Sequence, residues 1–187
     1  ITQNNQAGYV TTPPNPNEDW VEAECGTVGS LWQQKLDGDA SQGQYVEIQS
    51  GYTSYNSATT SASGQVRYNV EVSSAGYYNV FGRILTPSYS ENSFWVKVNN
   101  SSWAEWHTGV FSAWSWEKVT DYGYNPYFYL NSGSNVITVA YREPGSKLDK
   151  LFVSQSNTVP SGLGGAAQGC APTFEAPEGW SHECGSG

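Results

Sequence analysis

Tryptophans are concentrated in one part of this 187-residue chain. Five of the eight, Trp95, Trp103, Trp106, Trp114 and Trp116, lie within 22 residues, among Ser, Asn and Gly. An indole ring buries a large area at little cost in side-chain entropy, and its face stacks on the C–H face of a sugar. The rings could instead fill a β-protein core. We expect two or three in the core and one to three in a surface platform, because several lie beside polar, turn-forming residues. Sugar binding is therefore the first hypothesis.

The composition excludes several other functions. The net charge of −9 argues against nucleic acid as a partner, because such binding depends on Lys and Arg at the phosphates. No stretch approaches the roughly 20 apolar residues of a membrane span, which predicts no membrane insertion. Low charge with many Ser, Thr, Asn and Tyr residues is typical of secreted proteins. No signal peptide is visible, because Ile1 opens a polar segment.

Catalytic and zinc signatures are not found in the sequence. A glycosidase needs two carboxylates across a cleft, and no motif pairs Glu105, Glu117 or Glu143. There is no G-x-S-x-G nucleophile motif, no CxxC pair, and no zinc-like spacing of His107 and His182. The sequence therefore predicts a protein that is not an enzyme.

Short alternating segments separated by turn residues follow one another along the chain. The clearest are 66–72 and 77–85, which the turn between them predicts to be a hairpin. Further strands are expected at 20–25, 44–48, 94–98, 103–107, 114–119, 127–130, 136–141 and 148–154. This pattern of about ten strands predicts an all-β antiparallel β-sandwich, a jelly roll. Residues 1–18 are expected to be a linker, 19–156 the sandwich, and 157–187 a Gly/Pro-rich tail or the start of a next module.

Five motifs in order give the sandwich a family resemblance. They are Val21–Glu24, Ser93–Val96, Trp114–Val119, Tyr141–Glu143 and Lys147–Leu151. Together they resemble the family 6 carbohydrate-binding modules and the related family 35. The variant is one found in secreted bacterial polysaccharide-degrading proteins and adhesins.

The resemblance implies a jelly roll with a structural calcium. The family's calcium carboxylates match Glu22, Glu24 and Asp149, with backbone carbonyls of residues 42–44 completing the shell. Ca²⁺ takes six to eight oxygen ligands, so this donor set suits it. The alternative is that Glu22 and Glu24 are solvent-facing strand residues.

The resemblance also implies a glycan site at the loop tips, with Trp114 as the main stacking platform. Tyr89, Glu91 and Asn92 could line the same end, and Trp106 is a further aromatic candidate. Arg142 and Glu143 could bind sugar hydroxyls, or they could pair with each other. The family usually has Asn in that loop, which this sequence lacks. Some members use a second site on the concave sheet face.

Three cysteines allow one intrachain disulfide. Because the family places the first and last strands side by side, we expect Cys25–Cys170. Cys184 would then be a free thiol or a partner for sequence beyond this chain. The competing pair, Cys170–Cys184, needs only a local turn.

The resulting hypothesis is a non-catalytic, secreted or cell-surface module of a larger multidomain protein that binds a polysaccharide or glycan. The alternative is a structural or adhesive spacer with no glycan binding of its own.

Overall fold

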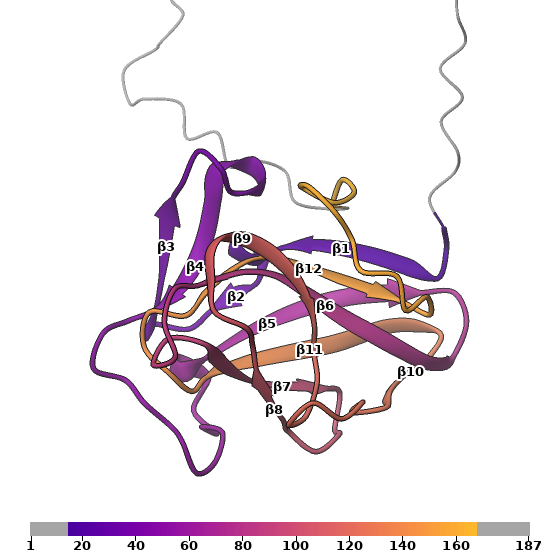
Figure 1. Cartoon of the computed structure of the whole chain (residues 1–187). Helices are drawn as coiled ribbons and strands as arrows, with labels where there is room; N and C mark the ends of the chain where they lie inside the picture. The colour runs from indigo at the N-terminus through magenta and orange to yellow at the C-terminus, as the bar shows by residue number, and fades with distance from the viewer. Residues whose placement is uncertain (1–14, 168–187) are drawn as a thin grey trace, which may run out of the picture.

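The computed structural model describes residues 15–167, which form an all-β sandwich of two antiparallel sheets (Figure 1). The larger sheet has seven strands: β1 (Glu18–Glu22), β3 (Trp32–Leu36), β4 (Gln44–Ile48), β6 (Gly76–Thr86), β9 (Phe111–Lys118), β10 (Phe128–Leu130) and β12 (Lys147–Ser154). The smaller sheet has five: β2 (Thr27–Val28), β5 (Gln65–Val72), β7 (Ser93–Val98), β8 (Ala104–His107) and β11 (Gly133–Tyr141).

Helical structure in the described residues is limited to three short 3₁₀ turns. They are η1 (Ala23–Cys25), η2 (Ser41–Gly43) and η3 (Ala62–Gly64). The predicted first strand, residues 20–25, therefore ends early: β1 stops at Glu22, and η1 follows. The polar stretch after it also contains two strands that the sequence did not reveal, β2 and β3.

The predicted hairpin is wrong. β5 pairs with β2 and β11 in the smaller sheet, whereas β6 pairs with β9, β10 and β12 in the larger one. The turn at residues 73–75 carries the chain from one sheet to the other. β5 buries alternate residues from Val66 to Val72, whereas β6 buries residues 80–84 consecutively.

The core lies between the two sheets and is filled mainly by aliphatic residues of alternating strand positions. Its largest fully buried side chains include Trp106, Tyr68, Phe94, Phe128, Ile84 and Leu151. On β6, Val80 and Ile84 belong to this core, so Phe81 and Arg83 project from the outer face of the larger sheet.

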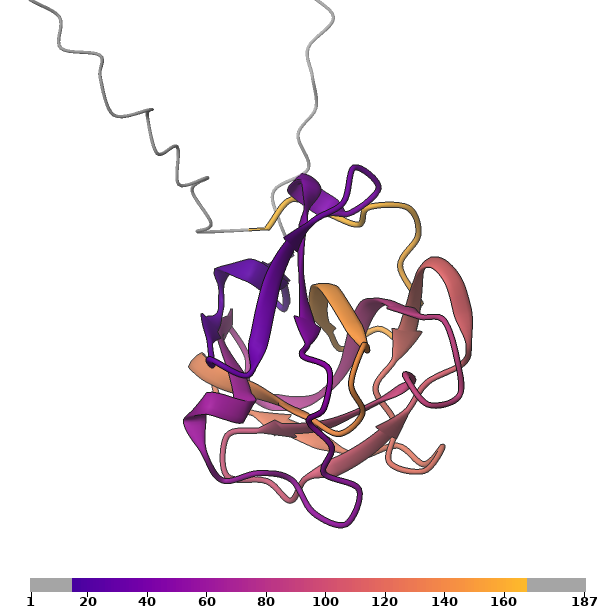
Figure 2. The same cartoon turned by 90° about the vertical axis from the view of Figure 1, so that its left-hand side faces the viewer.

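Two features of the larger sheet position the candidate site. The β3–β4 hairpin rises from one end of the sandwich, as Figures 1 and 2 show. β1 and β12 are antiparallel neighbours, as the family resemblance implied. Beyond β12, the segment 155–167, here called the C-terminal strap, crosses the outer face toward Trp20 and Trp116.

Candidate functional site

Trp114 lies on the outer face of the larger sheet, on β9. Because β9 pairs Trp116 with the outward-facing Arg83, the alternate residue Trp114 shares that face. Its indole Nε1 donates a hydrogen bond to Asp37 Oδ2 at 3.1 Å. Tyr45 packs edge-on against the ring at 5.2 Å between centroids, and the Arg83 guanidinium carbon lies 5.6 Å from the ring centre. The half-buried ring is therefore held in one orientation with part of its surface exposed.

A hollow of 640 Å³ opens beside this ring. Its walls come from three segments: the β3–β4 turn, the β6–β9 pair and the C-terminal strap. The lining residues are Asp37, Gly38, Asp39, Arg83, Leu85, Ser112, Ala113, Trp114, Gly162 and Leu163. An aromatic face, carboxylate oxygens and the hydroxyl of Ser112 therefore meet in one depression.

Arg83 forms hydrogen bonds to several of the segments around the hollow. Its Nη1 binds Asp149 Oδ2 at 2.5 Å, its Nε donates to the Gly162 carbonyl at 3.0 Å, and both Nη atoms donate to the Asp39 carbonyl at 3.1 Å. The side chain is only 7% exposed. Arg83 thus shapes the hollow, while the exposed carboxylate of Asp39 and hydroxyl of Ser112 remain accessible to a ligand.

The second tryptophan of the pair, Trp116, packs against Trp20 and the C-terminal strap. Trp116 meets Trp20 edge-on at 5.6 Å, and its Nε1 donates to the Gly162 carbonyl at 3.0 Å. A Cβ on Gly164 would come within 2.4 Å of the Trp20 ring. The C-terminal strap therefore contacts both of these rings. Trp114 and Trp116 are both half-buried, but only Trp114 lines the hollow.

Trp106, a predicted binding residue, belongs to the core, and the prediction for it is wrong. Its side chain is 0% exposed and packs against Phe94 at 5.3 Å between ring centroids. On β8, Ala104 and Trp106 point inward, while Glu105 and His107 point outward. The alternation of this short strand outweighs the polar residues around it.

Three predicted loop residues are occupied by partners within the protein. Asn92 Nδ2 donates to the Thr108 carbonyl at 2.7 Å, and its backbone N–H donates to Glu143 Oε2 at 2.9 Å. Arg142 forms ion pairs with Glu105 and, at 3.5 Å, with Glu143. All three predicted side chains are 7–8% exposed. Of the two roles considered for Arg142 and Glu143, the structure shows the mutual pairing.

The other two loop residues are more accessible. Tyr89 is 86% exposed, and half-buried Glu91 accepts a hydrogen bond from Ser88 Oγ at 2.7 Å. Neither lines the hollow beside Trp114. The structure thus does not bring Trp114 and the predicted loop residues into one pocket.

The three predicted calcium ligands gather where β1, η1 and β12 meet. Glu22 Oε1 accepts hydrogen bonds from Ser41 Oγ at 2.9 Å and contacts Lys150 Nζ at 2.8 Å. Asp149 Oδ1 accepts from the Ser41 backbone N–H at 2.8 Å. Burial is the main reason why the pKa of Glu24 is raised to about 7, and the neighbouring Glu22 and Asp149 carboxylates contribute to the same rise. Burial also raises the pKa of Asp149 to about 6, against the opposing effect of Arg83.

This cluster meets some requirements of a calcium site. Oε2 of Glu22 and Oε2 of Glu24 are buried, and neither has a hydrogen-bond partner within residues 15–167. When all three carboxylates are ionised, they carry one negative charge more than the two neighbouring cations, Arg83 and Lys150, supply. Within the same residues, however, no three His, Cys, Asp or Glu side chains form a metal-binding group by themselves. A bound Ca²⁺ would therefore need backbone carbonyls as well, which it accepts readily.

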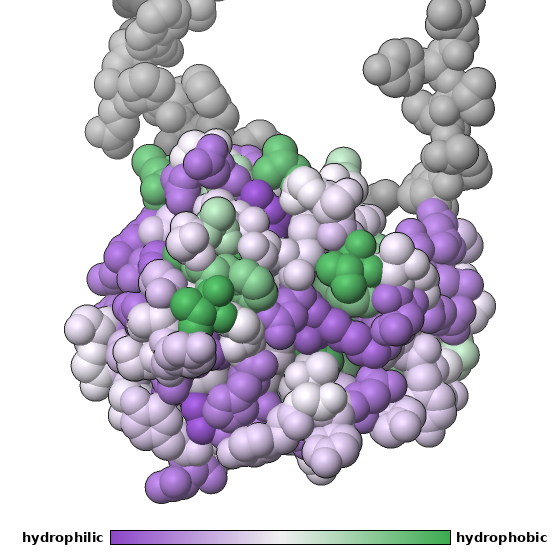
Figure 3. All heavy atoms as spheres, in the orientation of Figure 1, coloured by the Kyte–Doolittle hydropathy of each residue, from purple (hydrophilic) through white to green (hydrophobic). Residues whose placement is uncertain are grey.

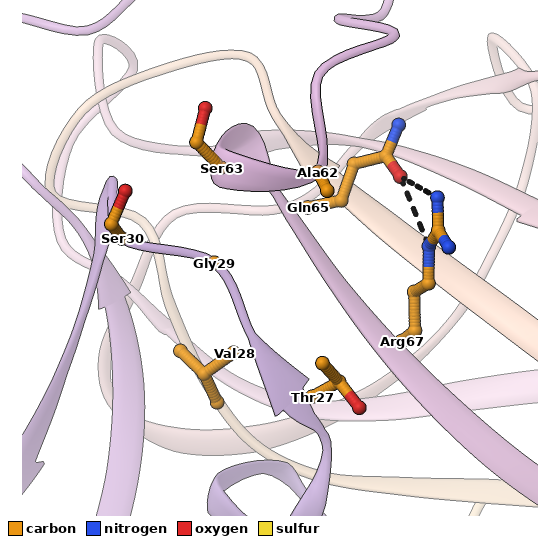
Figure 4. A pocket seen from close by; sticks show the side chains of 8 residues that line it. All are labelled: Thr27, Val28, Gly29, Ser30, Ala62, Ser63, Gln65 and Arg67. Atoms are coloured by element: carbon orange, nitrogen blue, oxygen red, sulfur yellow. Dashed lines mark hydrogen bonds between the residues drawn. The ribbon is translucent and has the colours of Figure 1, made fainter.

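A second depression, of 380 Å³, lies between β2 and η3 (Figure 4). Gln65 Oε1 accepts hydrogen bonds from Arg67 Nε at 3.3 Å and Nη2 at 3.1 Å, while the hydroxyls of Ser30 and Ser63 flank the opening. It presents no aromatic face. Figure 3 shows that hydrophobic atoms on the face of Figure 1 occur in small separate groups.

The predicted disulfide remains a prediction. Cys25 ends η1, next to the carboxylate cluster, whereas Cys170 and Cys184 lie outside the described residues.

Comparison with known proteins supports the fold. No protein-family model and no curated protein matches the sequence. Among solved structures, a family 35 carbohydrate-binding module from Clostridium thermocellum matches with a TM-score of 0.54 and 20% identity, over 73% of this chain and 98% of that one. The chain therefore has the fold of a family 35 carbohydrate-binding module.

Two multidomain enzymes contain a similar fold. A GH26-CBM35 β-(1,4)-mannanase from Podospora anserina matches with a TM-score of 0.55 and 16% identity, over 78% of this chain. An exo-β-1,3-galactanase from Phanerochaete chrysosporium matches with 0.54 and 21%, over 73%. The match spans 29% of each enzyme.

The part of the chain that the structure describes, residues 15–167, contains no helix that could span a membrane.

Proposed function

We propose that this chain is a non-catalytic carbohydrate-binding module that binds a polysaccharide or cell-surface glycan in the hollow beside Trp114. The observation that carries the proposal is the partly exposed Trp114 ring, fixed by Asp37 and Tyr45 at the wall of a 640 Å³ depression. The likeness of the fold to carbohydrate-binding modules supports the same class of ligand.

The chemistry of the hollow suits a sugar. The C–H face of a pyranose stacks on the indole. The Asp39 carboxylate accepts hydrogen bonds from sugar hydroxyls, and the Ser112 hydroxyl donates or accepts them. A preorganised ring loses little entropy on binding, which favours affinity. This position differs from the loop-tip site that the sequence suggested, and it lies on a sheet face instead.

We also propose a structural Ca²⁺ at Glu22, Glu24 and Asp149. The two buried carboxylate oxygens without hydrogen bonds support it. Bound there, the ion would contact the two buried carboxylate oxygens and hold β1, the η2 turn and β12 together. Its role would be to stabilise the domain rather than to contact the sugar.

The proposal includes a secreted or cell-surface location and a place within a larger, bacterial polysaccharide-degrading protein or adhesin. The alternative is a structural or adhesive spacer without glycan binding. One observation favours it: Asn92, Arg142 and Glu143, the polar loop residues predicted to bind sugar, are buried in internal contacts.

Affinity gel electrophoresis distinguishes the two functions. Gels would contain β-1,4-mannan or β-1,3-galactan, the polymer types that two structural neighbours' names suggest. Trp114→Ala should raise the dissociation constant for the polymer about thirtyfold, because a stacking Trp at a hot spot contributes about 2 kcal/mol or more to the free energy of binding.

Trp103→Ala is the matched control. Trp103 is a partly exposed tryptophan beside Lys97, outside the hollow. Retardation lost in Trp114→Ala and kept in Trp103→Ala supports the proposed site. If Trp114→Ala and Trp103→Ala are retarded equally, Trp114 is not part of the binding site. If the unmodified protein is not retarded, the result favours the spacer function.

A further inference from the structure

Exposed tyrosines gather at the β10 edge of the larger sheet, away from the hollow. Tyr77 on β6 and Tyr129 on β10 are a cross-strand pair, and Tyr127 precedes β10. Their neighbours Tyr78 and Phe128 point into the core, so Tyr77 and Tyr129 project outward. The three rings are 64%, 50% and 70% exposed for Tyr77, Tyr129 and Tyr127. We call these three residues the tyrosine edge.

The rings of the tyrosine edge are ordered by one another. Tyr77 meets Tyr129 at 5.4 Å with planes 80° apart, and Tyr127 at 6.3 Å with planes 81° apart. Edge-to-face contacts of this kind are favourable pair geometries. The three rings therefore form a preformed aromatic surface, although much of each ring remains in water.

The backbone supports this arrangement at a cost. Tyr127 has a φ of +52°, in the left-handed region that a non-glycine residue seldom adopts. Such strain persists where surrounding structure imposes it, and it concentrates at functional sites. At Tyr127 the strained residue presents its ring to solvent, which adds nothing to the core.

The segments that carry the tyrosine edge are uncharged in an otherwise acidic protein. Neither residues 72–82 nor residues 122–141 contain Asp, Glu, Lys or Arg, although the chain has a net charge of −9. The side-chain amide of Asn79 lies on β6, and that of Gln155 lies close to Gly76 at the start of the same strand. A neutral, aromatic and amide-bearing surface suits a neutral polysaccharide better than an ionic partner.

We infer that the tyrosine edge is a second saccharide-binding surface, which takes a single chain of a neutral polysaccharide. Because Tyr77 stands nearly perpendicular to both other rings, the three cannot form one flat platform for a crystalline polymer. A sugar instead stacks on one ring and contacts the edge of another.

This surface is separate from the hollow beside Trp114. Tyr77 and Leu85, which lines the hollow, are eight positions apart on β6, or about 26 Å along the strand. Figure 1 likewise places β10 at the opposite end of the sandwich from the β3–β4 hairpin. The inference shares the ligand class of the proposed function but not its residues. Two separate contacts on one long polymer strengthen overall binding through effective concentration.

Affinity electrophoresis in β-1,4-mannan and β-1,3-galactan gels tests the inference. Tyr127→Ala and Tyr129→Ala should each weaken binding of the polymer about fivefold or more, as expected for loss of an aromatic contact. Tyr124→Ala is the control, because Tyr124 is 78% exposed in the same connection but lies outside the tyrosine edge. It should change binding less than about twofold. Melting curves establish that each variant is folded, and Tyr127→Ala tests a ring that lies outside any strand.

The outcomes separate this inference from the proposed function. Loss in the Tyr127 and Tyr129 variants, further increased by Trp114→Ala, supports both sites. Loss in Trp114→Ala alone overturns the tyrosine edge and leaves the proposed function standing. Loss in the tyrosine variants alone does the reverse. No retardation of the unmodified protein by either polymer overturns both, and concentration-dependent dimers abolished by Tyr129→Ala would identify the edge as a self-association surface instead.

Discussion

Arg83→Gln offers a quantitative test of how the hollow is held together. Arg83 compensates Asp149, a side chain with 0% exposure, and also binds the carbonyls of Asp39 and Gly162. Removing one partner of a buried ion pair leaves an uncompensated charge and costs about 3–5 kcal/mol. Against a total stability of about 5–15 kcal/mol for a domain, this is a large fraction.

The loss should depend on pH, because Asp149 can become neutral by binding a proton. Without Arg83, its folded-state pKa rises further above the unfolded value, so the variant becomes less stable as pH increases. We therefore expect a destabilisation of about 3 kcal/mol or more at pH 7.5 and a clearly smaller one at pH 4.5.

Urea denaturation in EDTA at both pH values measures this difference without a contribution from calcium. Lys35→Gln is the control, because the Lys35–Glu47 pair spans 3.0 Å at the surface and Lys35 is 41% exposed. Its removal should cost less than about 1 kcal/mol. A loss below 1 kcal/mol for Arg83→Gln at both pH values would refute the argument.

Three further predictions concern the core and the carboxylate cluster. Gly82→Ala should destabilise the domain by about 1–3 kcal/mol, because the added Cβ would lie 2.6 Å from the Trp106 ring. Gly38→Ala is the control, because a Cβ on Gly38 would have no atom within 4 Å. Equal melting temperatures of the two variants would contradict this packing. In EDTA the free energy of unfolding should fall by roughly 1–2 kcal/mol from pH 4.5 to 7.5. The reason is that the raised pKa values of Glu24 and Asp149 make the folded state bind more protons than the unfolded state in this pH range. Stability that rises with pH would contradict this sign. Removal of calcium should lower the melting temperature by roughly 5–10 °C, since an ion at 100 times its Kd adds about 2.7 kcal/mol to the free energy of unfolding. An unchanged melting curve, with no metal found by elemental analysis, would exclude the ion.

The alternation of apolar and polar residues predicted most of the strands, and it located β4 at residues 44–48, as in the structure. It could not assign strands to sheets. Residues 66–72 and 77–85 alternate correctly whether they share a sheet or face each other across the core, so a short turn between them resembled a hairpin. The side-by-side position of β1 and β12 came from the family resemblance instead.

The candidate site was harder to predict, because it depends on contacts between distant segments. The family resemblance singled out Trp114, but its neighbours Asp37 and Arg83 lie 77 and 31 positions away in sequence and carry no motif. Trp106 resembled Trp114 in its polar surroundings, and the small Ala104 two residues earlier was the signal that its side faced the core. Arg142 and Glu143 had two open roles that only their neighbours could decide.

The most direct test of the central claim is a ¹⁵N NMR titration that follows the tryptophan indole N–H signals. Each signal is assigned by single substitution, and β-1,4-mannan or β-1,3-galactan oligosaccharides are added. Because Trp114 Nε1 is hydrogen-bonded to Asp37 at the wall of the hollow, its signal should shift most, while that of buried Trp106 stays nearly constant. Saturable binding that leaves the Trp114 signal unmoved would contradict the account.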